Sequence, residues 1–414
     1  GHIQDNVRES RNRNALSYSS WVVHFMPYDF DQVLDRRNTN SEKWDYLEDY
    51  FGRADVLPMW VADMDFPSPP EVVEAIRKRA EHPSYGYTGP SQAYYDSIAG
   101  WMGRRHGWTV EPEWIVTTPG VVPGLAVAIL AFTRPGDGVI VQSPVYPPFF
   151  RVVENNGRRL LNNELKRVGD RYEMDWDDLE KQLDSGARLL MLCSPANPVA
   201  RVWSEEELAR LHKMCSSRGV LVASDEIHSD IVYPWAKHIP FGCLGSGAAE
   251  NSITLVAPSK TFNIPGLATS VAIIPNPEVK ERFNFVLKGL GLGVNLFGLT
   301  ALEAAYTYGD RWLDEAICYV EENLKYMVEY LDRHVPGIKV IPPEGNYVVW
   351  LDCRGLGLDP ERLHKFMVDE ARVGLNDGRF FGSGGEGYQR INIACPRSIL
   401  REGLGRIAAA AARL

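Results

Sequence analysis

The chain has 414 residues, 45% of them hydrophobic and 24% charged, with eleven Trp and a formal net charge of −10. This composition excludes global disorder and predicts a large buried core, arranged as two or three domains or as one large domain with an appendage. Because the net charge is negative and no basic run stands out, it also excludes nucleic acid as the main partner.

The first 25 residues are rich in Asn, Arg and Ser and have no apolar segment of the signal-peptide kind. We expect a tag, a leader or a disordered arm there, with Met26 as the natural start; the alternative is a genuine arm that packs on a partner subunit. No apolar run reaches the ~18 residues that would predict a membrane span. Six Cys without a C-x-x-C pair, and no N-x-[ST] sequon, predict a reduced, cytoplasmic protein without a metal site.

Short apolar runs alternate with helical stretches between Ile115 and Ile274. The runs are rich in β-branched residues and do not alternate with polar ones, which is typical of strands buried on both faces. We therefore predict an α/β domain of three layers, with a mostly parallel, mixed sheet between helices. Its strands are expected at residues 115–118, 139–142, 189–193, 220–224, 253–257 and 269–274. A capping box at Ser204–Glu207 predicts where one of the helices begins, and Gly219 predicts where it ends.

The last third of the chain has a different pattern. An apolar stripe predicts a long helix over Asp310–Val335. Strands at 338–341, 347–352 and 388–394 and helices at 360–371 and from Arg397 then predict a smaller α+β domain. We expect an N-terminal arm at 26–62 that joins this small domain, a large domain at 63–300 and the small domain at 301–414.

Five candidate residues follow ends of the predicted strands, where open α/β sheets bind ligands. Lys260 becomes a nucleophile for carbonyls if burial lowers its pKa, or else reaches the surface. Asp225 can pair with a protonated ring nitrogen, and the Asn197 amide can donate to a phenolate oxygen; each can instead serve a cap or a turn. Tyr146 offers a ring for stacking. Gly120 starts a helix whose free N–H groups suit a phosphate, or serves only the turn.

One ligand needs all five groups at one sheet edge. A phosphate site, a stacking ring, an amide, a carboxylate for a ring nitrogen and an aldehyde-capturing lysine together describe pyridoxal 5′-phosphate, whose ring withdraws electrons from a carbanion. A competing motif, G-x-G-x-x-G at residues 382–387, precedes a predicted strand. A dinucleotide site requires that motif after a strand, so we interpret it as a flexible loop.

With these residues in place, the chain resembles the fold-type I pyridoxal-phosphate enzymes of aminotransferase class I/II. Within them it is most similar to the C–S β-lyase, or cystathionine β-lyase, subgroup. The resemblance runs from about Tyr28 to Leu414 and is carried by PMWVADMDFP, YGYTG, TPGVVPGLAVAI, SPVYPPF, SDEIHSDI, PSKTFNIPGL, GDRWLDEA and GYQRINIACPR.

The resemblance implies roles for the candidate residues. Lys260 would form a Schiff base with the cofactor and then move the Cα proton. Asp225, supported by His228, would pair with the pyridine nitrogen, Asn197 would bind the O3′ oxygen, and Tyr146 would stack on the ring. Lys260, Asp225 and Tyr146 are thus the expected catalytic residues.

The resemblance also implies how phosphate and substrate are held. The phosphate would lie on the backbone of Gly120, Val121 and Val122 and on Ser259. Tyr87 would reach the phosphate of the neighbouring subunit, which implies a homodimer with shared sites. Arg390 would clamp the substrate α-carboxylate with two hydrogen bonds, assisted by Ala62 and Asn197.

Two departures from the subgroup concern the cavity wall. Ala196 stands where a histidine is usual and Val199-Ala200 where Thr-Gly is usual, so we expect altered substrate choice there. Separately, Ala268 replaces the arginine that transaminases carry eight residues after the lysine. The expected function is β-elimination from L-cystathionine or another cysteine S-conjugate to a thiol, pyruvate and ammonia. The alternatives are an aminotransferase of class I/II and a regulatory protein on the same fold.

Overall fold

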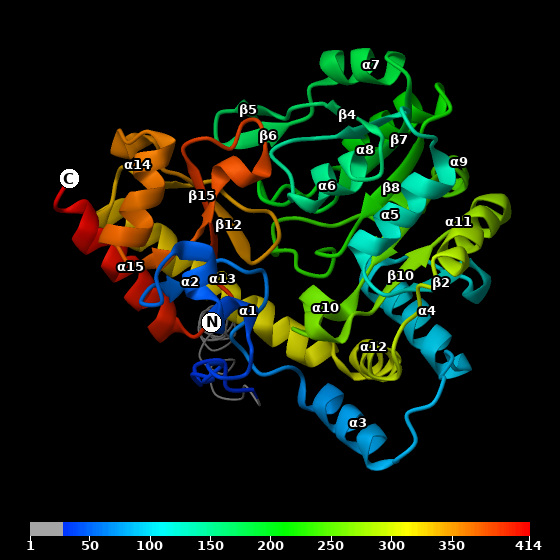
Figure 1. The fold of residues 1–414 in the computed structure, drawn as a ribbon, viewed down its shortest axis with the longest axis horizontal. Coiled ribbons are helices and arrows are strands. Elements are labelled where there is room, and N and C mark those ends of the chain that lie inside the picture. Colours follow the sequence, from blue (N-terminus) through cyan, green and yellow to red (C-terminus); the bar gives the residue numbers. More distant parts are fainter. Residues whose placement is uncertain (1–27) are drawn as a thin grey trace, which may run out of the picture.

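The structure is a computed structural model that describes residues 28–414. The expected tag or arm at 1–25 and the start at Met26 lie outside the described residues. A seven-stranded sheet in the order β2-β10-β9-β8-β7-β3-β4 lies in the right half of the view in Figure 1, opposite the C-terminal elements. β10 runs antiparallel to both of its neighbours and the other pairs are parallel, so the predicted mixed sheet is confirmed. The strands are β2 (Ile115–Thr118), β3 (Gly138–Val141), β4 (Arg159–Asn162), β7 (Ala187–Cys193), β8 (Leu221–Asp225), β9 (Ser252–Val256) and β10 (Ser270–Ile273).

Successive residues of the sheet enter two different cores, because side chains of a strand point alternately to its two faces. Leu189 and Met191 of β7 pack in one core, and Leu190 and Leu192 pack in the other. Helices α5 (Val121–Phe132), α6 (Pro148–Glu154) and α11 (Pro277–Gly289) cover the first core. Helices α7 (Trp176–Asp184) and α8 (Glu205–Ser216) cover the second. This is the three-layer arrangement that the apolar runs predict.

Helix α8 begins as the capping box predicts. The Glu207 N–H donates to Ser204 Oγ at 3.2 Å, and Glu207 Oε2 accepts from the Ser204 N–H at 2.8 Å. The helix ends at Ser216, and Gly219 follows it with a φ of +66°.

The smaller C-terminal unit is α+β, as expected. Its sheet has the order β11-β12-β15-β14 and is antiparallel throughout. These strands are β11 (Lys339–Val340), β12 (Val348–Asp352), β14 (Asn376–Asp377) and β15 (Tyr388–Asn392). The long helix α13 (Asp310–His334), the short α14 (Pro360–Lys365), which continues as a π-helical turn to Glu370, and α15 (Arg397–Ala411) complete the unit.

The N-terminal arm contains α1 (Glu42–Asp45) and α2 (Leu47–Phe51) and then joins the C-terminal unit. Its strand β1 (Leu57–Pro58) pairs in parallel with β13 (Val373–Gly374). Helices α3 (Pro70–Glu81), α4 (Gln92–His106) and α12 (Leu296–Tyr308) lie at the lower right of Figure 1, away from α14 and α15 at the left. One buried cluster includes side chains of the arm, α4, α12, α13 and β12. The domain limits at residues 62 and 300 therefore stay a prediction.

Two findings concern membrane spans and metal sites. Among residues 28–414, no helix has both the length and the apolar character needed to cross a bilayer. In the same part of the chain, no three His, Cys, Asp or Glu side chains are placed to hold a metal ion together. The Gly382–Gly387 segment is a loop that leads into β15, as predicted, rather than a turn that opens a helix.

Candidate active site

A cavity of about 220 Å³ lies where β7, β8 and β9 end and α5 begins. It brings together all of the predicted site residues except Tyr87 and Arg390. The predicted residues that line it are Ala62, Gly120, Val121, Val122, Tyr146, Asn197, Asp225, His228, Ser259 and Lys260. Segments that are far apart in the sequence thus meet at the sheet edge where the strand ends place them.

Lys260 lies on the short helix α10 (Pro258–Thr261), directly after β9. Its Nζ donates a hydrogen bond to the Ala62 carbonyl oxygen at 2.7 Å. Burial lowers the pKa of this amine to about 8; Asp63 opposes the shift and the Arg390 charge adds to it. At neutral pH a larger fraction of the amine is therefore neutral than in an exposed lysine, and a neutral amine is a nucleophile and a base.

Asp225 is the last residue of β8, and only 4% of it is exposed. One carboxylate oxygen accepts from the Ile227 N–H at 3.1 Å. Burial raises the pKa of Asp225 to about 7, and neighbouring Glu226 adds to that shift. A buried carboxylate of this kind favours a cationic ligand group as its partner.

His228 lies in the same cavity, but its expected support of Asp225 is not formed as a hydrogen bond. Its ring is edge-on to Tyr347, with 6.1 Å between centroids, and its Nδ1 is buried without a partner within residues 28–414. The Ile227 amide occupies the place next to Asp225 instead. Burial holds the pKa of His228 well below its usual range, so the imidazole is neutral.

Arg390 on β15 contacts the edge of the cavity through Asn197. Its Nη1 donates to Asn197 Oδ1 at 2.9 Å, and Nη2 donates to Asn376 Oδ1 at 2.7 Å and to the Trp60 carbonyl at 3.2 Å. Only 4% of Arg390 is exposed, and within residues 28–414 no carboxylate pairs with it. Burial lowers its pKa to about 10. A buried guanidinium held only by neutral oxygens is suited to bind an anion.

The N-terminus of α5 faces the cavity with Gly120, Val121 and Val122. Gly120 is the N-cap residue of this 12-residue helix, so the first N–H groups of the helix have no partner inside it. Together with the helix dipole they form an anion site, to which Ser259 adds a hydroxyl. Tyr146 lines the cavity, and burial raises the pKa of its phenol, so the ring remains neutral.

Thr269 and Ala268 also line the cavity, although the strand-end argument did not select them. The Thr269 Oγ1 is buried and has no hydrogen-bond partner in the described part of the chain. A signal existed: Thr269 directly precedes β10, which pairs with β2 so that Ser270 lies opposite Thr118, close to Gly120. Strand pairing therefore could have placed this hydroxyl near the anion site.

Ala196 corrects an expectation. It does not line the cavity but packs in the core covered by α7 and α8, beside Trp203 and Gln142. The reason is that Ala196 is packed among the apolar side chains of this core, while its neighbour Asn197 lines the cavity. Ala200 adopts a φ of +57°, which is the left-handed conformation that favours glycine, the residue that is usual at this position in the subgroup.

Tyr87 lies between α3 and α4 and is fully exposed in the single chain. It does not reach the cavity of its own subunit. A residue this large, aromatic and uncovered is available to contact another molecule.

A buried polar cluster behind α10 is not indicated by any sequence motif. The Asp230 carboxylate accepts hydrogen bonds from Thr261 Oγ1 at 2.8 Å, from Trp101 Nε1 at 2.9 Å and from His106 Nε2 at 2.7 Å. Since Thr261 follows Lys260, this cluster fixes the short helix that carries the amine. Asp230 belongs to the SDEIHSD string, but its role depends on α4, which is more than 120 residues away in sequence.

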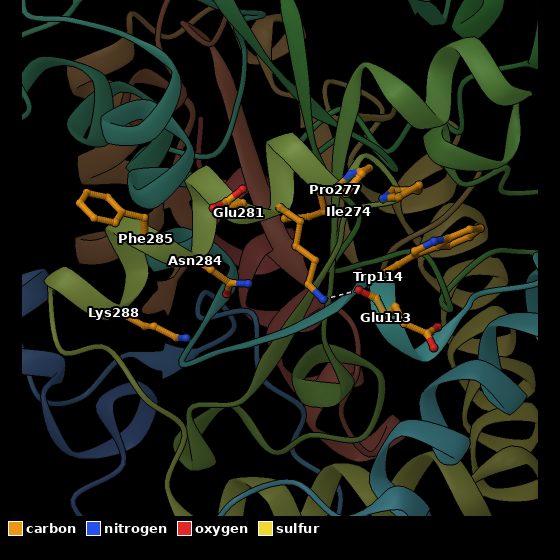
Figure 2. Close-up of a pocket in the computed structure, with 10 residues that line it drawn as sticks. Glu113, Trp114, Ile274, Pro277, Glu281, Asn284, Phe285 and Lys288 are labelled. Atoms are coloured by element: carbon orange, nitrogen blue, oxygen red, sulfur yellow. Dashed lines mark hydrogen bonds between the residues drawn. The ribbon is translucent and has the colours of Figure 1, made fainter.

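A second hollow lies beside α11 and the start of β2 (Figure 2). Lys280 of α11 donates a hydrogen bond to the carbonyl oxygen of Glu113, and Figure 2 shows Glu113 and Trp114 across the hollow from Phe285 and Lys288 of that helix. The hollow measures about 760 Å³ but is wide and lined mainly by apolar atoms, with Phe285 80% exposed. None of the candidate site residues lies in it, so the chemistry belongs to the smaller cavity.

Comparisons with known proteins agree with this site. The sequence profile of the family "Aminotransferase class I and II" matches residues 54–407. Cystathionine beta-lyase PatB of Bacillus subtilis is 46% identical over 92% of this chain and 99% of its own length. Cystalysin of Treponema denticola, solved with pyridoxal 5′-phosphate, superposes with a TM-score of 0.90 at 38% identity, over 93% of this chain and 99% of its own. The PLP-bound C–S lyase of Staphylococcus hominis gives a TM-score of 0.87 at 33% identity, over 92% of this chain and 98% of its own.

Proposed function

The chain belongs to the aminotransferase class I and II family, and from that premise we propose that it is a pyridoxal-phosphate-dependent C–S β-lyase. Its substrates are L-cystathionine or other cysteine S-conjugates, and its products are a thiol, pyruvate and ammonia. The observation that carries the proposal is the cavity in which Lys260, Asp225 and the N-terminus of α5 meet beside Arg390. Similarity to lyases over almost the whole chain supports it.

The residues of the cavity fit pyridoxal phosphate. Asp225 is a buried acid whose pKa of about 7 reflects the lack of a cationic partner, and a protonated pyridine nitrogen is such a partner. The unpaired N–H groups at Gly120 and the Thr269 hydroxyl, which is buried without a partner in residues 28–414, suit a phosphate. The amine of Lys260 suits the aldehyde. The ring nitrogen, the phosphate and the aldehyde of the cofactor would thus each find a group of complementary charge or reactivity.

When bound, the cofactor withdraws electrons from the substrate Cα and so makes the Cα–H proton acidic. Arg390 binds the α-carboxylate and fixes the amino acid in the cavity. The Lys260 Nζ donates a hydrogen bond to the Ala62 carbonyl oxygen at 2.7 Å, and this bond orients the amine. Lys260 then takes the Cα proton, because its pKa of about 8 lets it accept a proton near neutral pH.

The elimination needs only a leaving group on Cβ. As the proton leaves Cα for Lys260 Nζ, the Cβ–S bond breaks and its electron pair goes to sulfur, which leaves as a thiolate. Lys260 can return its proton to that thiolate. Water then replaces the nitrogen at Cα, so that one conjugate and one water give a thiol, pyruvate and ammonia. An aminotransferase would need a keto acid to receive the nitrogen.

Ala268 separates the lyase proposal from the transaminase alternative. It lines the cavity in a left-handed conformation with a φ of +46° and offers no charge where the transaminase arginine is expected. The regulatory alternative is not favoured by any particular observation, since the polar groups of the cavity are all present.

We also propose that the protein is a homodimer and that it is located in the cytoplasm. The exposed Tyr87 supports a dimer in which this tyrosine completes the phosphate site of the other subunit. All six cysteines carry free thiols, which supports a reducing compartment.

A product assay tests the proposal directly. Purified enzyme is supplied with L-cystathionine or S-alkyl-L-cysteines, and pyruvate is measured with and without added keto acids. We expect pyruvate and thiol in equal amounts without any keto acid. Turnover of amino acids that requires a keto acid, with no pyruvate from the cysteine conjugates, would overturn the lyase proposal in favour of an aminotransferase.

A further inference from the structure

The N-terminal arm carries an exposed carboxylate, Glu42, at the start of α1. Glu42 Oε1 accepts a hydrogen bond from the Tyr50 hydroxyl at 2.5 Å. The Tyr50 ring packs against Trp60, with 4.4 Å between the ring centroids. Trp60 in turn donates from Nε1 to the Lys43 carbonyl at 3.2 Å, which holds α1 above it. The carboxylate is therefore fixed through α1, α2 and the segment that leads into the cavity.

This wall leads from Arg390 outward. Arg390 Nη2 donates to the Trp60 carbonyl at 3.2 Å, and Trp60 contacts Tyr50, which holds Glu42. Exposure rises along this series, from 4% at Arg390 to 7% at Trp60 and 51% at Tyr50. The series therefore runs from the buried Arg390, which lies beside the cavity, to the surface of the protein. We refer to this exposed end as the mouth. If Arg390 holds the α-carboxylate, the far end of a long substrate lies toward the mouth.

The charge of Glu42 is not neutralised by the protein. Three carboxylates influence the Lys260 amine, namely Asp63, Asp225 and Glu42. Asp63 is bound by two nitrogens of Arg36, at 2.8 and 2.7 Å, and Asp225 lies inside the cavity. Within residues 28–414, Glu42 has no ion pair, and Tyr50 supplies its one hydrogen bond. Glu42 also raises the pKa of Tyr146 inside the cavity, which agrees with its place at the mouth.

We propose that Glu42 selects substrates whose sulfur substituent ends in an ammonium group. The inference rests on the proposed function, because it concerns the part of a cysteine S-conjugate beyond sulfur. An ammonium at the mouth would meet the Glu42 carboxylate, whereas a neutral substituent would gain nothing there and a carboxylate would be repelled. The far end of cystathionine carries such an ammonium next to a carboxylate, so the substituent that the inference favours most is one with an ammonium alone.

Three substrates of similar length and different charge test the inference. They are S-(2-aminoethyl)-L-cysteine, which is cationic at its end, S-propyl-L-cysteine, which is neutral, and S-(2-carboxyethyl)-L-cysteine, which is anionic. In Glu42→Gln we expect kcat/KM to fall about three- to tenfold for the first, to stay unchanged for the second and to rise for the third. Glu48→Gln, a change at an exposed glutamate of α2, is the matched control and should leave all three values unchanged.

The outcomes are distinguishable. An equal loss with all three substrates would mean that Glu42 only supports the arm, and the inference would be wrong. If wild-type enzyme makes pyruvate from none of them, the proposed function fails, and the charge preference is measured instead as dissociation constants from the change in cofactor absorbance. Loss of the preference for the cationic amino acid in Glu42→Gln supports the inference in either assay, and an unchanged preference overturns it.

Discussion

At the scale of single residues, the environment of the Lys260 nitrogen decides when it reacts. Burial lowers its pKa to about 8, so the neutral amine predominates above pH 8 rather than above the ordinary value near 10. We expect the rate at which cofactor-free protein captures pyridoxal phosphate to rise with pH and to level off just above 8. Stopped-flow absorbance gives this profile.

Lys260→Ala is the control for that profile. It should keep its fold, lose turnover by orders of magnitude and bind no cofactor that borohydride can fix. Borohydride fixation at a different lysine of the wild-type protein would contradict the assignment.

Arg390 gives a prediction about substrate binding. Its guanidinium is buried and held by the oxygens of Asn197, Asn376 and Trp60. Under our proposal, removing its charge removes the cationic group that binds the α-carboxylate. A buried, charge-assisted pair of hydrogen bonds contributes roughly 2–4 kcal/mol, so Arg390→Gln should lower kcat/KM by ~30- to 1000-fold. Steady-state kinetics measure this loss.

The Arg390 effect should be the same for every L-amino-acid substrate, because all present the same carboxylate. Arg390→Lys should recover part of the loss, since the charge returns without the two parallel hydrogen bonds. A loss confined to one substrate, or a change of product, would place the carboxylate elsewhere.

At the scale of elements, the loop between β7 and α8 contains a strained residue. Ala200 has a φ of +57°, a conformation that costs a residue with a Cβ about 1–2 kcal/mol. Ala200→Gly should therefore stabilise the protein by about 1 kcal/mol, which for a chain of this size is a rise in Tm of roughly 1–2 °C. Calorimetry of the loaded enzyme measures it.

Gly219 after α8 provides the reverse change. Its φ is +66° and a Cβ there would meet nothing within 4 Å, so Gly219→Ala alters only the backbone preference. It should lower Tm by a similar amount. Opposite signs for the two variants are required; the same sign for both would show that contacts, and not backbone conformation, decide stability at these two positions.

The strands of the central sheet were predictable because burial on both faces leaves continuous apolar runs. Residues 115–118, 189–193 and 253–257 each lie in a strand within one or two residues of the predicted limits. The strand ends also predicted which side chains meet, since parallel strands end at one edge. The 382–387 loop was interpreted correctly for the same reason, because position relative to a strand decides what a glycine motif can do.

What the sequence could not give depends on contacts between distant elements. The Asp230 cluster requires α4 to pack behind α10, and Glu42 is linked to Trp60 only by way of the Tyr50 side chain. The direction of side chains in loops could not be predicted from the sequence either. Ala196 faces the core while its neighbour Asn197 faces the cavity, and no periodicity in an irregular loop indicates which residue points where.

At the scale of the whole molecule, the proposed role of Tyr87 in the phosphate site of the other subunit would make activity a property of two subunits. We expect Lys260→Ala protein and Tyr87→Ala protein to be poorly active alone. When the two are mixed and allowed to exchange subunits, each mixed dimer contains one site with native Lys260 from one chain and native Tyr87 from the other. Activity should therefore return on mixing, as measured by pyruvate release.

The mixing experiment has a built-in control. Lys260→Ala mixed with a chain that carries both substitutions contains no complete site and should stay inactive. Recovery in that mixture, or a fully active Tyr87→Ala protein, would show that each chain works alone.

The buried carboxyl of Asp225 also affects whether the molecule stays folded. Its pKa is about 7 in the folded chain and ~3.9 when unfolded, so the empty protein binds that proton more tightly than the unfolded chain does. This contribution to stability is full below pH ~4 and is lost as the pH rises through 7, by about 4 kcal/mol in all. A cationic ring nitrogen beside Asp225 would remove the loss, so the gap in Tm between loaded and empty protein should widen from pH 5 to 8. A gap in Tm that narrows over this range would contradict the prediction.

The same pH dependence has a consequence for newly made chains. At neutral pH they would depend on the supply of cofactor to survive proteolysis, which couples the abundance of the enzyme to the vitamin from which that cofactor is made.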